Sequence, residues 1–138
     1  MWKYYALLSA FFAALTAILA KLGLREVGGN IATAIRTIVI LFLAWGIVIA
    51  RGQIRDVGEI SRSSLLFLVA SGLTTGLSWV FYFKAMETGN VSHVAAIDKL
   101  SLAITIGLAA LFLKETVDLT TILGAAMIVV GTFVIAQH

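Results

Sequence analysis

Residues 94–113 read VAAIDKLSLAITIGLAALFL, an apolar stretch that carries an acid and a base side by side near its start. A helix needs about 20 residues to cross a hydrocarbon core of about 30 Å, so this stretch is long enough to span a bilayer. Asp98 and Lys99 stand out against its composition. Charged side chains inside a span are rare and usually serve a function, which makes this segment the natural starting point.

Four further segments have the same apolar character and a similar length: 4–20, 31–50, 65–83 and 119–136. Backbone groups in lipid must form hydrogen bonds within the protein, so each segment is expected to be a continuous helix. The sequence therefore predicts an all-α integral membrane protein with five transmembrane helices, forming a single domain over residues 1–138.

The overall composition supports the same class. Hydrophobic residues make up 61% of the chain and charged residues 12%, whereas soluble domains hold about 45–50% and about 25%. The net charge is +3, but the basic residues cluster between the apolar segments. This pattern is typical of charges that flank membrane spans, so we expect the lipid bilayer as a partner and no nucleic acid.

Several classes of chemistry find no support in the sequence. The chain has no cysteine, and its two histidines, His93 and His138, lie far apart. We identify no catalytic nucleophile–base pair, no metal-ligand cluster and no phosphate-binding motif. The protein is therefore expected not to be an enzyme and to need neither a metal nor another cofactor.

Charges at the span ends bear on orientation. With five spans, the face that holds the N-terminus collects five basic residues and the opposite face three, while Arg36 and Lys99 lie within spans. The positive-inside rule then favours a cytoplasmic N-terminus, but only by a small margin. Insertion in both orientations stays open.

Asn30 is expected to cap the second helix, and KETVD (114–118) is expected to form a tight hairpin.

Polar side chains from four helices fall at one depth. Arg36 and Asp98 lie near the starts of their spans, about 6–8 Å below the face opposite the N-terminus, and Thr16 and Trp79 lie at a similar depth near the ends of theirs. Spacings of three and four residues place further polar side chains on the same helix faces. The face that holds Trp79 also carries Ser71, Thr75, Ser78 and Tyr82. The face that holds Asp98 also carries Ser101 and Thr105.

This polar layer has two interpretations. Arg36 and Asp98 are expected to pair, and because one acid cannot neutralise both Arg36 and Lys99, the layer carries a formal charge of +1. It is either a substrate or ion pathway or a device that locks two helices together, with Lys99 reaching the membrane surface. Trp79 and Tyr82 are either an aromatic wall for a ligand or part of an interfacial belt.

Small residues mark candidate sites of close helix packing. Gly72 and Gly76 form a GxxxG pattern, and Gly124 and Gly131 lie seven residues apart. The last span carries no charge and contains only threonines as polar residues, which suits a scaffold or dimer face better than a pathway.

Several motifs together resemble the EamA family of the drug/metabolite transporter superfamily. They are ATAIRT (32–37), SWVFYFKA (78–85), KAMETGNVS (84–92), IDKLS (97–101) and ILGAAMIVVGT (122–132). The resemblance covers nearly the whole chain and is closest to short members with one five-helix repeat. Many relatives carry a proline near Ala95 or Ala96, whereas this chain has none, which puts a kink there in doubt.

The resemblance implies a fold, a partner and a function. Full-length relatives hold two such repeats in inverted topology, so a single-repeat chain is expected to form an antiparallel homodimer in the inner (plasma) membrane, with its binding site at the repeat interface. The family implies secondary transport or exchange of small organic metabolites by alternating access, without a common substrate.

Within that function, residues of the polar layer take candidate roles. Asp98 is the in-span acid able to couple transport to protons. Arg36 and Lys99 attract a carboxylate or other anion, and Trp79, Tyr82, Ser78 and Ser101 contact the ligand.

Two alternatives stay open. A small multidrug-resistance type of cation/proton antiporter needs an acid in its first helix, and residues 4–20 contain none. A non-transporting scaffold or assembly subunit would use the in-span charges only to set helix register.

Overall fold

The computed structural model describes residues 1–137, which form helices and turns with no strand among them, while His138 lies outside the described residues. The helices, in chain order, are α1 (Trp2–Gly23), α2 (Gly29–Ala50), the short 3-10 helix η1 (Arg55–Glu59), α3 (Arg62–Thr88), α4 (Val91–Asp98), α5 (Leu100–Phe112) and α6 (Leu119–Ala136).

Five helical segments are long and apolar enough to cross a membrane, with α4 and α5 together forming one of them. The predicted all-α membrane architecture is thus confirmed. The α6 bounds agree with the predicted span, but α1, α2 and α3 begin before and end at or beyond the predicted apolar stretches. A helix can continue past its apolar stretch because its backbone hydrogen bonds form in the interfacial region as well.

The predicted cap of α2 is wrong. Gly28, with φ −68° and ψ 154°, is the N-cap residue, and Asn30 lies inside the first turn. Gly28 has no side chain with which to cap the helix, and the carboxylate of Glu87 accepts a hydrogen bond from the N–H of Gly29 instead. Glu87, which is far from Gly29 in the chain, therefore takes the capping role that the sequence pattern assigned to Asn30.

The prediction of a continuous fourth helix is also wrong. The segment is interrupted at Lys99, whose N–H donates to the carbonyl of Ala96 at 3.0 Å, while the N–H of Leu102 donates to the carbonyl of Lys99 at 3.0 Å. Both bonds join residues three apart instead of the four of an α-helix. Proline is the usual cause of such breaks, and this chain contains none.

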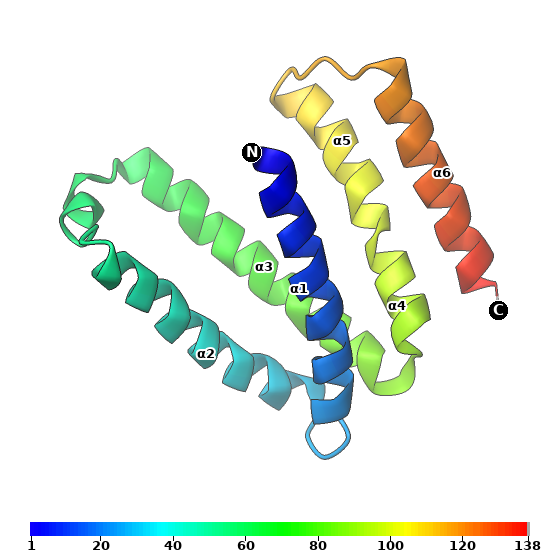
Figure 1. Ribbon diagram of the computed structural model, residues 1–138, viewed down its shortest axis with the longest axis horizontal. Coiled ribbons are helices and arrows are strands. Elements are labelled where there is room, and N and C mark those ends of the chain that lie inside the picture. The colour runs from blue at the N-terminus through cyan, green and yellow to red at the C-terminus, as the bar shows by residue number, and fades with distance from the viewer. Residues whose placement is uncertain (138) are drawn as a thin grey trace. The chain divides into compact units, whose positions relative to one another are not determined.

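The chain divides into two compact units, which are described separately. One unit combines Met1–Ile18 with the chain from Thr88 onward, and the other covers Leu19–Glu87. In the first unit α6 packs along α4 and α5, and in the second α2 and α3 run antiparallel and are joined through η1 (Figure 1).

Most apolar side chains lie on the outside of the helices. Phe42 of α2 is 74% exposed and Phe67 of α3 is 76% exposed, whereas Phe83 and Met86 near the end of α3 are fully buried. In a bilayer this surface faces lipid tails that are as apolar as the side chains, so hydrophobicity does not drive the helices together. Specific polar and close contacts must then decide how the helices pair.

Candidate functional site

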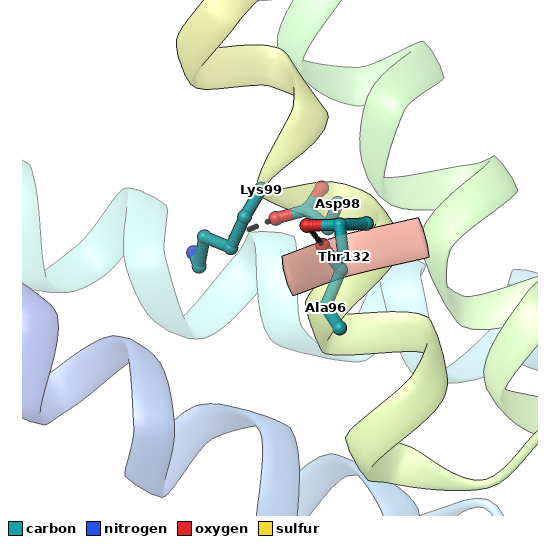
Figure 2. A network of polar contacts seen from close by, with 4 residues as sticks. All are labelled: Ala96, Asp98, Lys99 and Thr132. Atoms are coloured by element: carbon teal, nitrogen blue, oxygen red, sulfur yellow. Dashed lines mark hydrogen bonds and ion pairs between the residues drawn. The ribbon is translucent and has the colours of Figure 1, made fainter. Parts of the chain in front are cut away.

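The interruption between α4 and α5 carries the charged pair. Asp98 is the last residue of α4, and its Oδ2 lies 3.7 Å from Nζ of Lys99 (Figure 2). The two side chains are 41% and 61% exposed, respectively. A carboxyl group within an apolar span therefore lies at the point where the helix loses its regular hydrogen bonding.

A buried threonine of α6 contacts this interruption. The hydroxyl of Thr132 donates a hydrogen bond of 3.1 Å to the carbonyl of Ala96, the same carbonyl that accepts from Lys99 (Figure 2). Thr132 is only 4% exposed. In lipid, irregular backbone is tolerated where neighbouring helices and Ser or Thr side chains bond to its polar groups, and Thr132 adds such a bond at the carbonyl of Ala96.

Sequence reasoning missed this role of Thr132. It treated α6 as a scaffold because the helix has no charge. The available signal was a lone threonine in the second half of an otherwise apolar stretch, where hydroxyls often bond between helices. Its partner is a backbone carbonyl, which no sequence motif marks.

In the other unit, Arg36 of α2 lies against two aromatic rings of α3. Its Cζ is 5.2 Å from the ring centroid of Trp79 and 4.5 Å from that of Phe83. Trp79 and Phe83 are four residues apart, so one face of α3 presents both rings. Cations are attracted to the faces of aromatic rings at such distances, which helps to hold a charge within the span.

The face of α2 that carries Arg36 also allows close contact with α3. Gly29, Thr33 and Arg36 recur at helical spacing, and the hydroxyl of Thr33 bonds back to the carbonyl of Gly29 at 2.8 Å. A Cβ on Gly29 would lie 3.1 Å from the carbonyl carbon of Phe83 and 3.2 Å from the backbone nitrogen of Lys84. Only glycine therefore fits at this crossing without displacing α3.

Two charged side chains, Glu87 of α3 and Lys21 of α1, contact helix ends in this unit. Glu87 accepts from the first N–H of α2, and Nζ of Lys21 donates to the carbonyl of Met86 at 2.6 Å. A helix N-terminus favours negative charge and a C-terminus positive charge, so both contacts complement the helix dipoles. Both residues lie just beyond the predicted apolar segments 4–20 and 65–83, where no pattern in the sequence indicates these contacts.

The remaining predicted pathway residues lie on several helices. The ring of Tyr82 meets that of Phe83 edge to face, with centroids 5.7 Å apart. Thr16 in α1 is partly buried, whereas Ser78 in α3 and Ser101 in α5 are exposed. The hydroxyl of Thr75 bonds to the carbonyl of Ser71, so this part of the predicted stripe is satisfied within its own helix.

The predicted packing glycines are open in this chain. A Cβ added at any of the four would meet no atom of its own unit within 4 Å. They are Gly72, Gly76, Gly124 and Gly131. Close helix packing at these positions stays a prediction.

Arg36 and Asp98 belong to different units, so their direct pairing stays a prediction. Their positions along their helices agree, however. Gly29 begins α2 and Val91 begins α4, so each residue lies seven positions after the start of its helix, or about 10 Å along the axis. This exceeds the predicted depth of about 6–8 Å because both helices begin earlier than expected.

Comparison with known proteins agrees with these features. The model of the EamA-like transporter family matches residues 1–137. A Sinorhizobium protein described as an uncharacterized transporter in the cobO 3' region is 45% identical over 135 residues, which cover 98% of this chain and 96% of that protein. No solved structure matches the chain. The matches point to transport across a membrane and not to an enzyme, and they show that this multi-pass membrane protein belongs to the EamA-like transporter family.

Proposed function

We propose that this protein is a secondary transporter or exchanger of small organic metabolites that works by alternating access and couples to protons through Asp98. The observation that carries the proposal is the interruption of the fourth span at Lys99, next to an acid within an apolar segment. Transporter sites are commonly built from broken helices, because the freed backbone groups and charges can bind solutes or ions.

The interruption supports a hinge. Around Lys99 the backbone uses bonds between residues three apart, so α4 and α5 can change their mutual angle without breaking a regular α-helical ladder. The bond from Thr132 to Ala96 holds the end of α4 against α6 in the conformation described here. Alternating access would exchange this arrangement for a second one.

The charge pair supports a coupling role. When Asp98 is ionised, it faces the ammonium group of Lys99 at 3.7 Å. Protonation of Asp98 removes that attraction and leaves Lys99 as an uncompensated cation near the membrane interior, which is unfavourable. The protonation state of one carboxyl group can thereby bias the hinge between two arrangements.

A second copy of the chain completes the transporter in this proposal. One chain supplies five spans, and the transporter is an antiparallel homodimer in the inner membrane. The small margin of basic residues between the two faces suits a chain that inserts both ways, although a cytoplasmic N-terminus is the favoured orientation. The open glycine faces of α3 and α6 offer surfaces for close packing with the second copy.

Transport in proteoliposomes tests this proposal. The purified protein is reconstituted, and uptake from a panel of radiolabelled organic acids, amino acids and amines is measured with and without an inward proton gradient. We expect at least one solute to accumulate faster with the gradient. Asp98→Asn should abolish the effect of the gradient, while Glu26→Gln, which changes an exposed acid in a loop, should not.

Two outcomes would contradict the proposal. If Asp98→Asn transports with an unchanged pH dependence, Asp98 does not couple protons. If no solute in the panel crosses the membrane faster than in protein-free vesicles, transport of small metabolites is wrong. Circular dichroism and elution volume show whether each variant keeps the native fold.

A further inference from the structure

Arg36 of α2 lies against two aromatic rings. The rings of Trp79 and Phe83 lie 5.2 and 4.5 Å from its guanidinium carbon, both contributed by α3. Phe83 is buried, and Arg36 and Trp79 are each partly buried. The guanidinium group is thus held in place by aromatic contacts, which attract the charge but accept no hydrogen bond in the plane of the group.

The hydrogen-bonding capacity of Arg36 is unused within its unit. A guanidinium group has five N–H donors in a fixed fork. Within residues 19–87 the contacts of Arg36 are with the rings of Trp79 and Phe83 and, electrostatically, with Tyr82, and none of the three carries a carboxylate. Arg36 is therefore held by its neighbours without being neutralised by them.

The charge balance of the spans indicates what is missing. Asp98 is the only acid within the five apolar segments predicted from the sequence, and it already lies 3.7 Å from Lys99. One carboxylate cannot neutralise two cations. Within these apolar segments Arg36, Lys99 and Asp98 leave a net charge of +1, which a single negative charge from outside the protein would cancel.

We infer that Arg36, oriented by Trp79 and Phe83, binds the carboxylate group of the transported solute, so that the substrates are small monocarboxylates. This inference rests on the proposed transport function. A carboxylate is planar and matches the guanidinium fork with two parallel hydrogen bonds. One negative charge also balances the spans, whereas a doubly charged phosphate ester would leave an excess of negative charge.

Tryptophan fluorescence gives a direct binding assay. The chain has three tryptophans, and replacing Trp2 and Trp45 by phenylalanine leaves Trp79, beside Arg36, as the only one. The purified protein is titrated with acetate, butyrate and benzoate, and in parallel with the neutral analogues acetamide, butyramide and benzamide. We expect at least one acid to change the emission saturably, and its amide to bind at least tenfold more weakly.

Variants of Arg36 test the assignment of the site. Arg36→Gln should weaken carboxylate binding at least tenfold. Arg36→Lys keeps the charge but loses the fork, so binding should weaken by a smaller factor and stay selective for the acid over the amide. If Arg36→Gln does not fold, Arg36→Lys alone still tests the geometry, because unchanged affinity in that variant would show that the fork is not used.

Several results would overturn the inference. They are the absence of any carboxylate response, equal binding of an acid and its amide, a full response in Arg36→Gln, or a response to inorganic phosphate with none to the carboxylates. Proteoliposome uptake separates this from the proposed function. Carboxylate binding without uptake refutes transport but not the site, whereas uptake of amines or neutral solutes that is indifferent to Arg36→Gln refutes the site but not transport.

Discussion

The hydroxyl of Thr132 in α6 donates a 3.1 Å hydrogen bond to the carbonyl of Ala96, three residues before the interruption at Lys99. The two residues are 36 positions apart in the chain. This contact links the last helix to the broken span and gives the carbonyl of Ala96 a second donor beside the N–H of Lys99.

Replacing Thr132 by valine should destabilise the protein. The substitution keeps the shape of the side chain and removes the donor, so we expect the free energy of unfolding to fall by about 1 kcal/mol. Thermal unfolding in detergent measures the change. Thr132→Ser retains the hydroxyl and should lose less stability than the valine variant. An unchanged stability in Thr132→Val would show that the contact contributes nothing.

Replacing Gly29 by alanine should also destabilise the protein, for a steric reason. The new Cβ would lie 3.1 Å from the carbonyl carbon of Phe83 and 3.2 Å from the nitrogen of Lys84, and backbone atoms of α3 cannot rotate away. Overpacking of this kind costs about 1–3 kcal/mol.

Gly46 provides the matched control on the same helix, because a Cβ there meets nothing within 4 Å. Gly46→Ala should change the free energy of unfolding by less than about 1 kcal/mol in either direction. Equal effects of the two substitutions would argue against a close contact at Gly29. The comparison uses the same detergent and the same thermal unfolding assay for both variants.

The cap of α6 should make stability depend on pH. Asp118 is the N-cap residue, and hydrogen bonds from the hydroxyl and the backbone N–H of Thr121 lower the pKa of its carboxyl group. Because the folded pKa lies below the unfolded value of about 3.9, the stabilisation is complete above that value and is lost as the pH falls through the folded pKa.

Asp118→Ala should therefore lower the unfolding temperature at neutral pH, and its difference from the unmodified protein should shrink below about pH 4. Asp118→Asn keeps a capping oxygen but has no titrating carboxyl group. Its stability should therefore not show the fall at low pH that comes from protonation of Asp118. Melting curves between pH 3 and pH 7 test both variants. A constant difference between Asp118→Ala and the unmodified protein would contradict an ionised cap.

Single cysteines should reveal insertion in both orientations. The chain has no cysteine of its own, so Ser63→Cys and Glu26→Cys each introduce one thiol, and the unmodified protein is the blank. Both residues are exposed. One span, α2, separates them along the chain, so they lie on opposite sides of the membrane. Glu87 is a poorer choice for labelling because it accepts the hydrogen bond from Gly29.

A membrane-impermeant maleimide applied to intact cells should label part of each cysteine variant, with the remainder labelled after the membrane is opened. This outcome supports two orientations and the antiparallel homodimer. Labelling of one variant only would show a fixed orientation, and the antiparallel homodimer would then be wrong. Expression of both variants is compared by immunoblot of the same samples.

Much of the fold could be predicted because hydropathy is a local property. Each span is recognisable from about 20 consecutive residues, and the bounds of α6 agree with the prediction at both ends. The sequence also predicted a similar depth for Arg36 and Asp98, and each lies seven positions after the start of its helix, although both helices begin earlier than predicted. The bounds of α1 and α3 were predicted less well, because helices continue beyond the apolar residues.

The candidate site was predicted only in part. The sequence pointed to Arg36, Trp79 and Asp98 as residues of interest. Charged side chains within a membrane span are rare and usually serve a function. The sequence did not point to Phe83, since a phenylalanine in an apolar helix looks like any lipid-facing residue. Its contact with Arg36 depends on how α2 and α3 approach each other.

The sequence by itself determined the class of the protein, the number of its spans and the charges they contain, because these depend on residue types summed over short stretches. The tertiary structure decided the interruption at Lys99, the hydrogen bond from Thr132 to Ala96 and the capping of α2 by Glu87. Two of these contacts join residues 36 and 58 positions apart. Such contacts involve backbone groups common to every residue, so only the packing of the helices selects which of them meet.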